Sequence, residues 1–154
     1  MLGNMSSKFQ ELLLEGLLDR HALPAALAWL NQVCGTDTAQ LIALSQTNRI
    51  LESALIGTVD QDLFKKEEEY LPVNPRAKAI MAAGTGRVLQ DHDFIQDEAI
   101  AKDIAYQELL IPAHVGRFAG VTLSRGPDEL ILLAVAQPWE NGPLEEHAAQ
   151  RFSD

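Results

Sequence analysis

The sequence predicts an α+β fold in which an antiparallel sheet of about five strands is flanked by helices. Stretches with apolar residues at helical spacing lie near both ends of the chain. Short strand-like segments, bounded by turn residues, occur in two pairs, as in hairpins. Strands that follow one another, with helices grouped between the pairs, favour α+β over a parallel sheet.

Two helices are expected first. Residues 7–20 repeat apolar side chains every four residues, which is typical of an amphipathic helix. Residues 23–35 form the second helix, with Pro24 in the first turn and Gly35 at its end. Two strands follow over residues 38–47 and 49–59, joined by a tight turn at Asn48.

The middle of the chain is expected to be mainly helical. Residues 60–72 read as a helix or an exposed loop, and the acidic run Glu67 to Glu69 as its solvated face. Residues 74–84 form a helix with Asn74 as N-cap, Pro75 in the first turn and Gly84 at its end. A short strand is expected over residues 86–91. A helix is expected within residues 97–116, opened by Asp97 and limited in length by Pro112.

Residues 117–125 and 129–137 are the clearest strand pair, joined by a Gly-Pro-Asp turn. Residues 129–137 carry apolar side chains at both odd and even positions. Because neighbouring side chains of a strand point to opposite faces, this strand should be central and covered on both sides. A helix over residues 143–152 closes the chain.

Composition limits the class of protein. The 154 residues include 47% hydrophobic residues, enough for one domain with a full core. A single cysteine, Cys34, excludes an internal disulfide and fits a cytoplasmic setting. No apolar run approaches the roughly 20 residues that span a membrane, and no signal peptide is visible. With 22 acidic and 12 basic residues, the chain is a poor binder of nucleic acid, so another segment would have to contact DNA.

Reactive chemistry finds little support. Asp91, His92 and Asp93 are adjacent, but successive side chains of a strand cannot all face one ion, so we predict no metal site and no cofactor. His92 has no recognisable nucleophile as partner, and we predict no catalytic residue, although a small hydrolase-like enzyme using these three residues stays an alternative. The Gly-Thr-Gly-Arg stretch at 84–87 lacks the ending of a phosphate loop and reads as a turn.

A binding pocket is the better-supported kind of site. Small-molecule pockets are mostly apolar, with a few polar groups that fix the ligand's orientation. The candidate ligand-binding residues are Tyr70, Asn74, Tyr106, Phe118 and Trp139. Each of them also has a plain interpretation as a packing residue.

Three stretches resemble a known family. Residues 70–95 (YLPVNPRAKAIMAAGTGRVLQDHDFI), 101–125 (AKDIAYQELLIPAHVGRFAGVTLSR) and 129–152 (ELILLAVAQPWENGPLEEHAAQRF) resemble the N-terminal PAS/GAF-like sensor domains of LuxR-type regulators, which precede a GerE-type helix-turn-helix. In the branch that binds acyl-homoserine lactones, a Tyr precedes an Asp-Pro step whose Asp bonds the ligand amide. Here Tyr70 precedes Asn74-Pro75, and the upstream Trp and second Tyr of that branch are absent.

The resemblance implies a PAS/GAF-like, homodimeric sensor that binds a small molecule and acts on DNA through a helix-turn-helix absent from this chain. On that basis residues 1–154 are expected to form one ligand-sensing and dimerisation domain, in contact with no membrane. The apolar stripes of residues 7–20 and 143–152 are the expected dimer surface. A ligand-free structural dimerisation module is the alternative.

Overall fold

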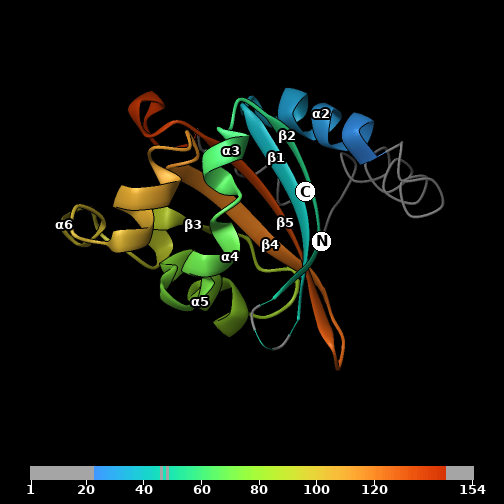
Figure 1. The fold of residues 1–154 in the computed structure, drawn as a ribbon. Helices are drawn as coiled ribbons and strands as arrows, with labels where there is room; N and C mark the ends of the chain where they lie inside the picture. The colour runs from blue at the N-terminus through green and yellow to red at the C-terminus, as the bar shows by residue number, and fades with distance from the viewer. Residues whose placement is uncertain (1–22, 46, 48, 145–154) are drawn as a thin grey trace.

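The computed structural model describes residues 23–45, 47 and 49–144. In this part of the chain, five antiparallel strands form one sheet in the order β2-β1-β5-β4-β3 (Figure 1). The strands are β1 (Thr38–Ser45), β2 (Ile50–Gly57), β3 (Leu89–Gln90), β4 (Arg117–Arg125) and β5 (Glu129–Gln137). The predicted five-stranded antiparallel sheet is confirmed, and β5 is its central strand, as its apolar composition indicated.

Both faces of β5 are covered. Leu133 and Val135 are each 1% exposed and pack on one face of the sheet. Ala134 and Ala136, at the alternate positions, pack on the other face. A strand that buries both faces needs cover on each, and different helices provide it here.

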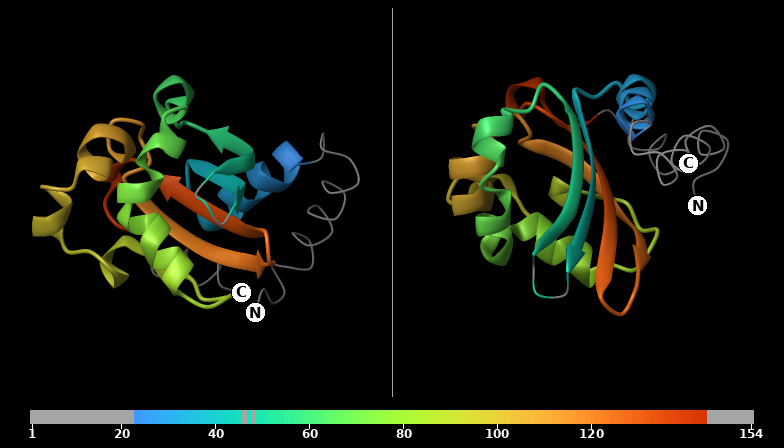
Figure 2. Two further views of the ribbon diagram at one scale, coloured as in Figure 1. Left: turned by 60° about the horizontal axis from the view of Figure 1, so that its bottom comes forward. Right: turned by 45° about the vertical axis from the view of Figure 1, so that its right-hand side comes forward.

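One face of the sheet is covered by α2 (Leu23–Cys34). Its buried residues, Ala26, Leu27, Leu30 and Cys34, follow helical spacing and form one apolar cluster with β1, β4 and β5. Figure 2 shows α2, in blue, on the opposite side of the sheet from the other helices. Cys34 is a buried core residue, the role expected of a small thiol in an apolar helix.

The other face is covered by a chain of short helices between β2 and β4 (Figure 2). They begin with α3 (Gln61–Phe64), α4 (Glu67–Tyr70), the 3-10 turn η2 (Leu71–Val73) and α5 (Pro75–Ala82). The expected cap of α5 is confirmed, because the Asn74 side chain accepts a hydrogen bond from the Arg76 backbone N–H at 2.9 Å.

The prediction of one helix over residues 97–116 is wrong. The segment contains α6 (Asp97–Ile100) and, after a turn, the π-helical η4 (Tyr106–Leu110). The break has a local cause: the Asp103 carboxylate accepts a hydrogen bond from the Tyr106 backbone N–H at 3.0 Å, which starts a new helical segment. Asp97 is not the N-cap of α6, since Gln96 occupies that position.

The strand predicted over residues 86–91 is reduced to the two residues of β3. Before it, Gly86 adopts a φ of 84° and its N–H donates to the Thr122 carbonyl at 2.9 Å, so the Gly-Thr-Gly stretch is a turn anchored on β4. Asp91, His92 and Asp93 form the 3-10 turn η3 (Asp91–Asp93).

Some expectations fall on residues outside the described part of the chain. These are the helix over 7–20, the turn at Asn48 and nearly all of the helix over 143–152, so the expected dimer surface stays a prediction. Among the helices of residues 23–144 that the structure describes, none combines the length and apolarity needed to cross a bilayer.

Candidate functional site

A cavity lies between the sheet and the helical layer formed by α3, α4 and α5. Its walls come mainly from β1, β4 and β5 on one side and from these helices on the other, with further contributions from Leu55 of β2 and Leu110 of η4. Its volume is about 80 Å³. Drug-sized ligands occupy pockets of roughly 300–1,000 Å³, so this space suits a compact guest.

The sheet side of the cavity follows from strand alternation. Thr38, Gln40, Ile42 and Leu44 occupy every second position of β1 and all line the cavity, whereas Ala39 packs toward α2. On β4 the wall includes Gly120, where a Cβ atom would lie 2.5 Å from the Phe118 ring. The absent side chain therefore leaves room for Phe118 in the cavity wall.

Five polar side chains line this mostly apolar space: Thr38, Gln40, Glu67, Asn74 and Arg76. Thr38 is 2% exposed, and its hydroxyl has no hydrogen-bond partner among the described residues. Buried polar atoms are nearly always paired, so an unpaired hydroxyl at the wall of a cavity is a feature that a bound ligand would explain.

Glu67 is a partly buried carboxylate at the helical wall. Its Oε1 accepts a hydrogen bond from Gln40 Nε2 at 3.0 Å, and the same amide donates to Ser53 Oγ at 3.1 Å. Burial raises the pKa of Glu67 from 4.5 to about 7, against the opposing effects of the Gln40 hydrogen bond and the positive charge of Arg76. Near neutral pH this carboxyl therefore exists in both protonation states.

A buried ionic network lies beside the cavity and includes Arg76 of the wall. Arg76 Nε donates to Asp91 Oδ1 at 3.0 Å, and its Nη2 lies 2.9 Å from the same oxygen. The Tyr106 hydroxyl donates to this Asp91 oxygen as well, while the Phe118 backbone N–H donates to Asp91 Oδ2 at 2.8 Å. The Arg76 guanidinium also lies over the Phe118 ring, 4.5 Å from its centroid.

The charges of this network are held in place by one another. Burial works against the charge of Arg76, but the adjacent Asp91 and Tyr106 raise its pKa above the ordinary value. Burial, helped by Asp91, raises the pKa of the Tyr106 hydroxyl, so it stays a neutral donor. Arg76 and Asp91 thus form an ion pair whose charges largely cancel.

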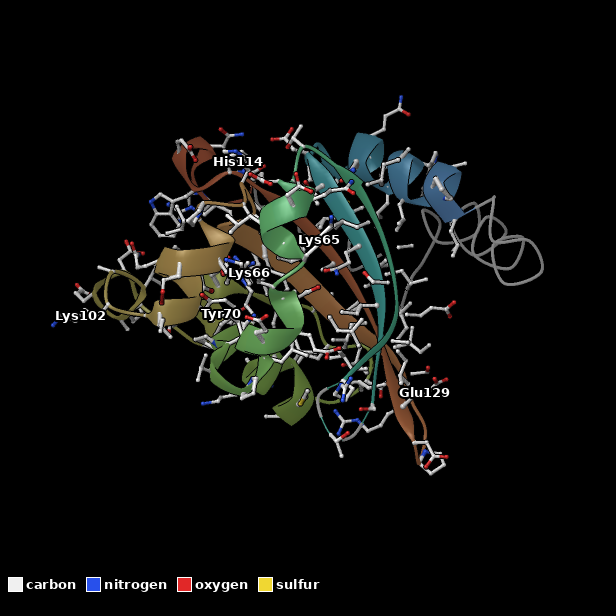
Figure 3. All side chains as sticks on the ribbon, in the orientation of Figure 1. Lys65, Lys66, Tyr70, Lys102, His114 and Glu129 are labelled. Carbon is white, nitrogen blue, oxygen red and sulfur yellow. The ribbon has the colours of Figure 1, made fainter. Side chains whose placement is uncertain are left out.

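The structure separates the five predicted ligand-binding residues into groups. Asn74 and Phe118 line the cavity. Tyr106 is 0% exposed and lies behind the wall, in the network of Arg76 and Asp91. Tyr70, labelled in Figure 3 at the end of α4, is partly buried against the core of the helical layer. Trp139, in η5 (Trp139–Asn141), stacks with Arg117, whose guanidinium carbon is 3.4 Å from the ring centroid.

Sequence reasoning missed four of the five polar residues of the wall: Thr38, Gln40, Glu67 and Arg76. The interpretation of Glu67 to Glu69 as a solvated face is wrong for Glu67, which faces the cavity, and for Glu68, which accepts hydrogen bonds from Arg49 Nε and the Ile50 N–H. The partners of these two glutamates are 18 or more positions away along the chain, so no local pattern marks them. Nothing in the sequence around Glu67, which precedes the Leu71-Pro72 step, indicates that its side chain is buried.

The adjacent Asp91, His92 and Asp93 point to three different partners. Asp91 faces Arg76, His92 Nε2 lies 3.0 Å from Asp97 Oδ1, and Asp93 Oδ2 accepts from the Gln90 N–H at 2.7 Å. Within the described ranges, no three His, Cys, Asp or Glu residues lie close enough together to hold a metal ion.

The fold is shared with solved ligand-binding domains. The chain is similar to the VqsR ligand-binding domain from Pseudomonas aeruginosa, with a TM-score of 0.64 and 13% identity over 88% of this chain and 81% of that one. It is also similar to the N-acylhomoserine-lactone-dependent LuxR-family transcription factor CepR2 from Burkholderia cenocepacia, with a TM-score of 0.61 and 14% identity over 96% of this chain and 86% of that one. No protein-family model and no curated protein sequence matches the chain.

Proposed function

We propose that this chain is the small-molecule sensor domain of a LuxR-type transcriptional regulator. The observation that carries the proposal is the cavity between the sheet and the helices α3 to α5, with an apolar wall and a few polar side chains. The shared fold of VqsR and CepR2 supports it further. The role we propose is binding rather than catalysis, and the separate partners of Asp91, His92 and Asp93 are consistent with it.

The proposed mechanism is a shift of population between two arrangements of the domain. A ligand in the cavity touches the sheet and the helical layer at once, so it favours the arrangement in which the two are in contact. Only a difference in affinity between the arrangements moves the equilibrium. The terminal segments of a cytoplasmic homodimer would pass this change to a DNA-binding domain elsewhere in the regulator, with residues 1–154 acting as one unit.

The predicted contacts take different roles in this proposal. Asn74 and Phe118 touch the ligand directly, since both are in the wall. Tyr106 acts through Asp91, whose other oxygen holds the Phe118 backbone. Direct contacts from Tyr70 and Trp139 stay predictions.

Native mass spectrometry of freshly purified protein tests the proposal, together with thermal shift against a metabolite panel. A co-purified compound of fixed mass, or a compound that raises the melting temperature, is the expected result. A ligand at about 100 times its Kd adds roughly 2.7 kcal/mol to the free energy of unfolding. The Ala134→Leu variant serves as control, because its larger side chain occupies the cavity and should abolish either signal.

The small volume favours one alternative, a structural dimerisation module without a ligand. A space of about 80 Å³ could be no more than a packing defect in such a module. The alternative predicts no bound mass, no stabilising compound and an Ala134→Leu variant that dimerises normally. This set of results would remove the sensor proposal.

A further inference from the structure

The polar groups of the cavity differ in whether their charge is already balanced. Arg76 lines the cavity and is paired at 2.9 Å with Asp91, which lies behind the wall. Glu67 receives one neutral hydrogen bond, from Gln40, and no ion pair joins it to a basic side chain in the described part of the chain. When Glu67 is ionised, the group formed by Arg76, Asp91 and Glu67 therefore carries one net negative charge facing the cavity.

We infer that the cavity accepts a compact apolar amine, whose protonated nitrogen donates to the Glu67 carboxylate. This deepens the proposed sensor function and rests on it, since it names the chemical class of the ligand. Glu67 would then be the residue that determines specificity for the ligand's head group.

The geometry of Glu67 fits this role. The bond from Gln40 uses Oε1, so Oε2 can accept from a guest. Gln40 is itself held by Ser53, which fixes the carboxylate through the sheet. Most of the remaining wall is apolar and includes Phe64 on α3 and Leu55 on β2. An ammonium group on a short branched alkyl chain matches a carboxylate within an apolar wall of about 80 Å³.

An acidic ligand is disfavoured by the same arrangement. Its carboxylate would have to compete with Asp91 for Arg76, whose Nη2 lies 2.9 Å from Asp91 Oδ1 but makes no hydrogen bond among the described residues. It would also be repelled by ionised Glu67, and a like-charge contact in a desolvated site is costly. The unpaired Thr38 hydroxyl can either donate or accept, so it discriminates little between the two classes.

Three compounds with one branched carbon skeleton test the inference by isothermal titration calorimetry: 3-methylbutylamine, 3-methylbutan-1-ol and 3-methylbutanoate. The expected order of affinity is amine, then alcohol, then carboxylate, with about tenfold or more between the first and the last. Equal or tighter binding of the carboxylate overturns the inference, as does an alcohol that outbinds the amine.

The Glu67→Gln variant separates charge from shape. Its neutral amide oxygen can still accept a hydrogen bond from Gln40, but it cannot balance an ammonium. Amine affinity should fall about tenfold or more, while the alcohol should change little. Glu69→Gln, an exposed change on the same helix α4, is the matched control and should leave all affinities within about twofold. An unchanged amine affinity in Glu67→Gln overturns the inference.

The pH dependence gives a second readout that needs no variant. The pKa of Glu67 is about 7, whereas a simple alkylamine stays protonated up to about pH 10. The charged groups facing the cavity are Glu67 and Arg76, with Asp91 behind Arg76, and Arg76 stays charged throughout. Amine affinity should therefore rise about tenfold from pH 6 to pH 8 as Glu67 ionises. A flat or falling profile contradicts the inference.

Failure of the inference can be told apart from failure of the sensor function. If the alcohol or the carboxylate binds and the amine does not, the ligand class is wrong and the sensor function stands. If none of the three compounds binds, the amine inference is likewise overturned, while the sensor function is decided by the native mass spectrum of the purified protein.

Discussion

The two faces of the sheet are built on different principles. The face under α2 is filled by apolar side chains, and Ala26, Ala39 and Ala119 there are each 0% exposed. The face under α3 to α5 contains a cavity, an unpaired hydroxyl, a titrating carboxyl and a buried ion pair. Both faces belong to the same strands, so the difference lies in the side chains at alternate positions.

This difference indicates a division of labour. Close packing as on the α2 face stabilises a fold and leaves no room for a guest. Buried polar groups beside an empty space weaken a fold unless something pairs with them. The cavity face is therefore packed less closely than the α2 face, and the space left open can hold a ligand.

Removing the carboxylate of Asp91 should have the largest effect. In Asp91→Ala, the Arg76 guanidinium, the Tyr106 hydroxyl and the Phe118 N–H all lose an acceptor. Breaking a buried ion pair from one side costs about 3–5 kcal/mol. Urea denaturation measures the change. His92→Ala, an adjacent exposed change, should stay within about 0.5 kcal/mol of the wild type. A loss below about 1 kcal/mol for Asp91→Ala would contradict the importance of the network.

Two neighbouring leucines of β5 compare the faces directly. Leu133 is buried in the cluster with α2 although it also borders the cavity, while Leu132 is only partly buried and packs on the cavity face. Leu133→Ala should cost about 2–5 kcal/mol of unfolding free energy, because it opens a hole in a packed core. Leu132→Ala should cost less, about 1–2 kcal/mol, because the Leu132 side chain is only partly buried and loses less apolar burial. Denaturant titration of both variants gives the two values, and a larger loss for Leu132→Ala would reverse the assignment of the faces.

Enlarging an alanine on each face sharpens the same comparison. Ala39→Leu inserts atoms where the residue has 0% exposure, and overpacking of this kind costs about 1–3 kcal/mol. Ala134→Leu projects into the cavity and should change stability by less than about 1 kcal/mol, because the space is empty. Thermal unfolding of the pair measures the contrast. Equal destabilisation by the two changes would mean that the cavity is not present in solution.

The smallest expected effect is the dependence of stability on pH through Glu67. Its pKa is about 7 in the folded protein and near 4.5 when it is exposed to water. The folded state thus holds the proton of Glu67 more tightly than the unfolded state does. The contribution of protonated Glu67 to the free energy of unfolding is therefore complete below pH 4.5 and is lost as the pH rises through 7. Glu67→Gln cannot ionise, so its free energy of unfolding should exceed that of the wild type by about 1–2 kcal/mol at about pH 8 but by little at about pH 4.5. The size of this difference takes account of the partial exposure of Glu67.

Chemical denaturation at the two pH values measures this difference, with Glu69→Gln as control. The comparison between variants removes the contribution of the other carboxylates. A gain for Glu67→Gln that is the same at both pH values would show that the carboxyl does not titrate in this range.

Features set by neighbours in sequence could be predicted from the sequence. The central position of β5 follows from apolar residues on both of its faces, and the Asn74 cap from an Asn-Pro step. The wall residues Glu67 and Arg76 could not be predicted, because their partners Gln40 and Asp91 lie 27 and 15 positions away. The break near Asp103 was missed since a continuous apolar spacing outweighed one short-range carboxylate bond.

The central claim is that the cavity face binds a small molecule while the α2 face does not. Amide NMR titration with 3-methylbutylamine tests this claim most directly. The account predicts shift changes that saturate and cluster at Gln40, Glu67 and Asn74, with the amides of α2 unmoved. Shift changes centred on α2, or spread evenly over both faces of the sheet, would contradict it.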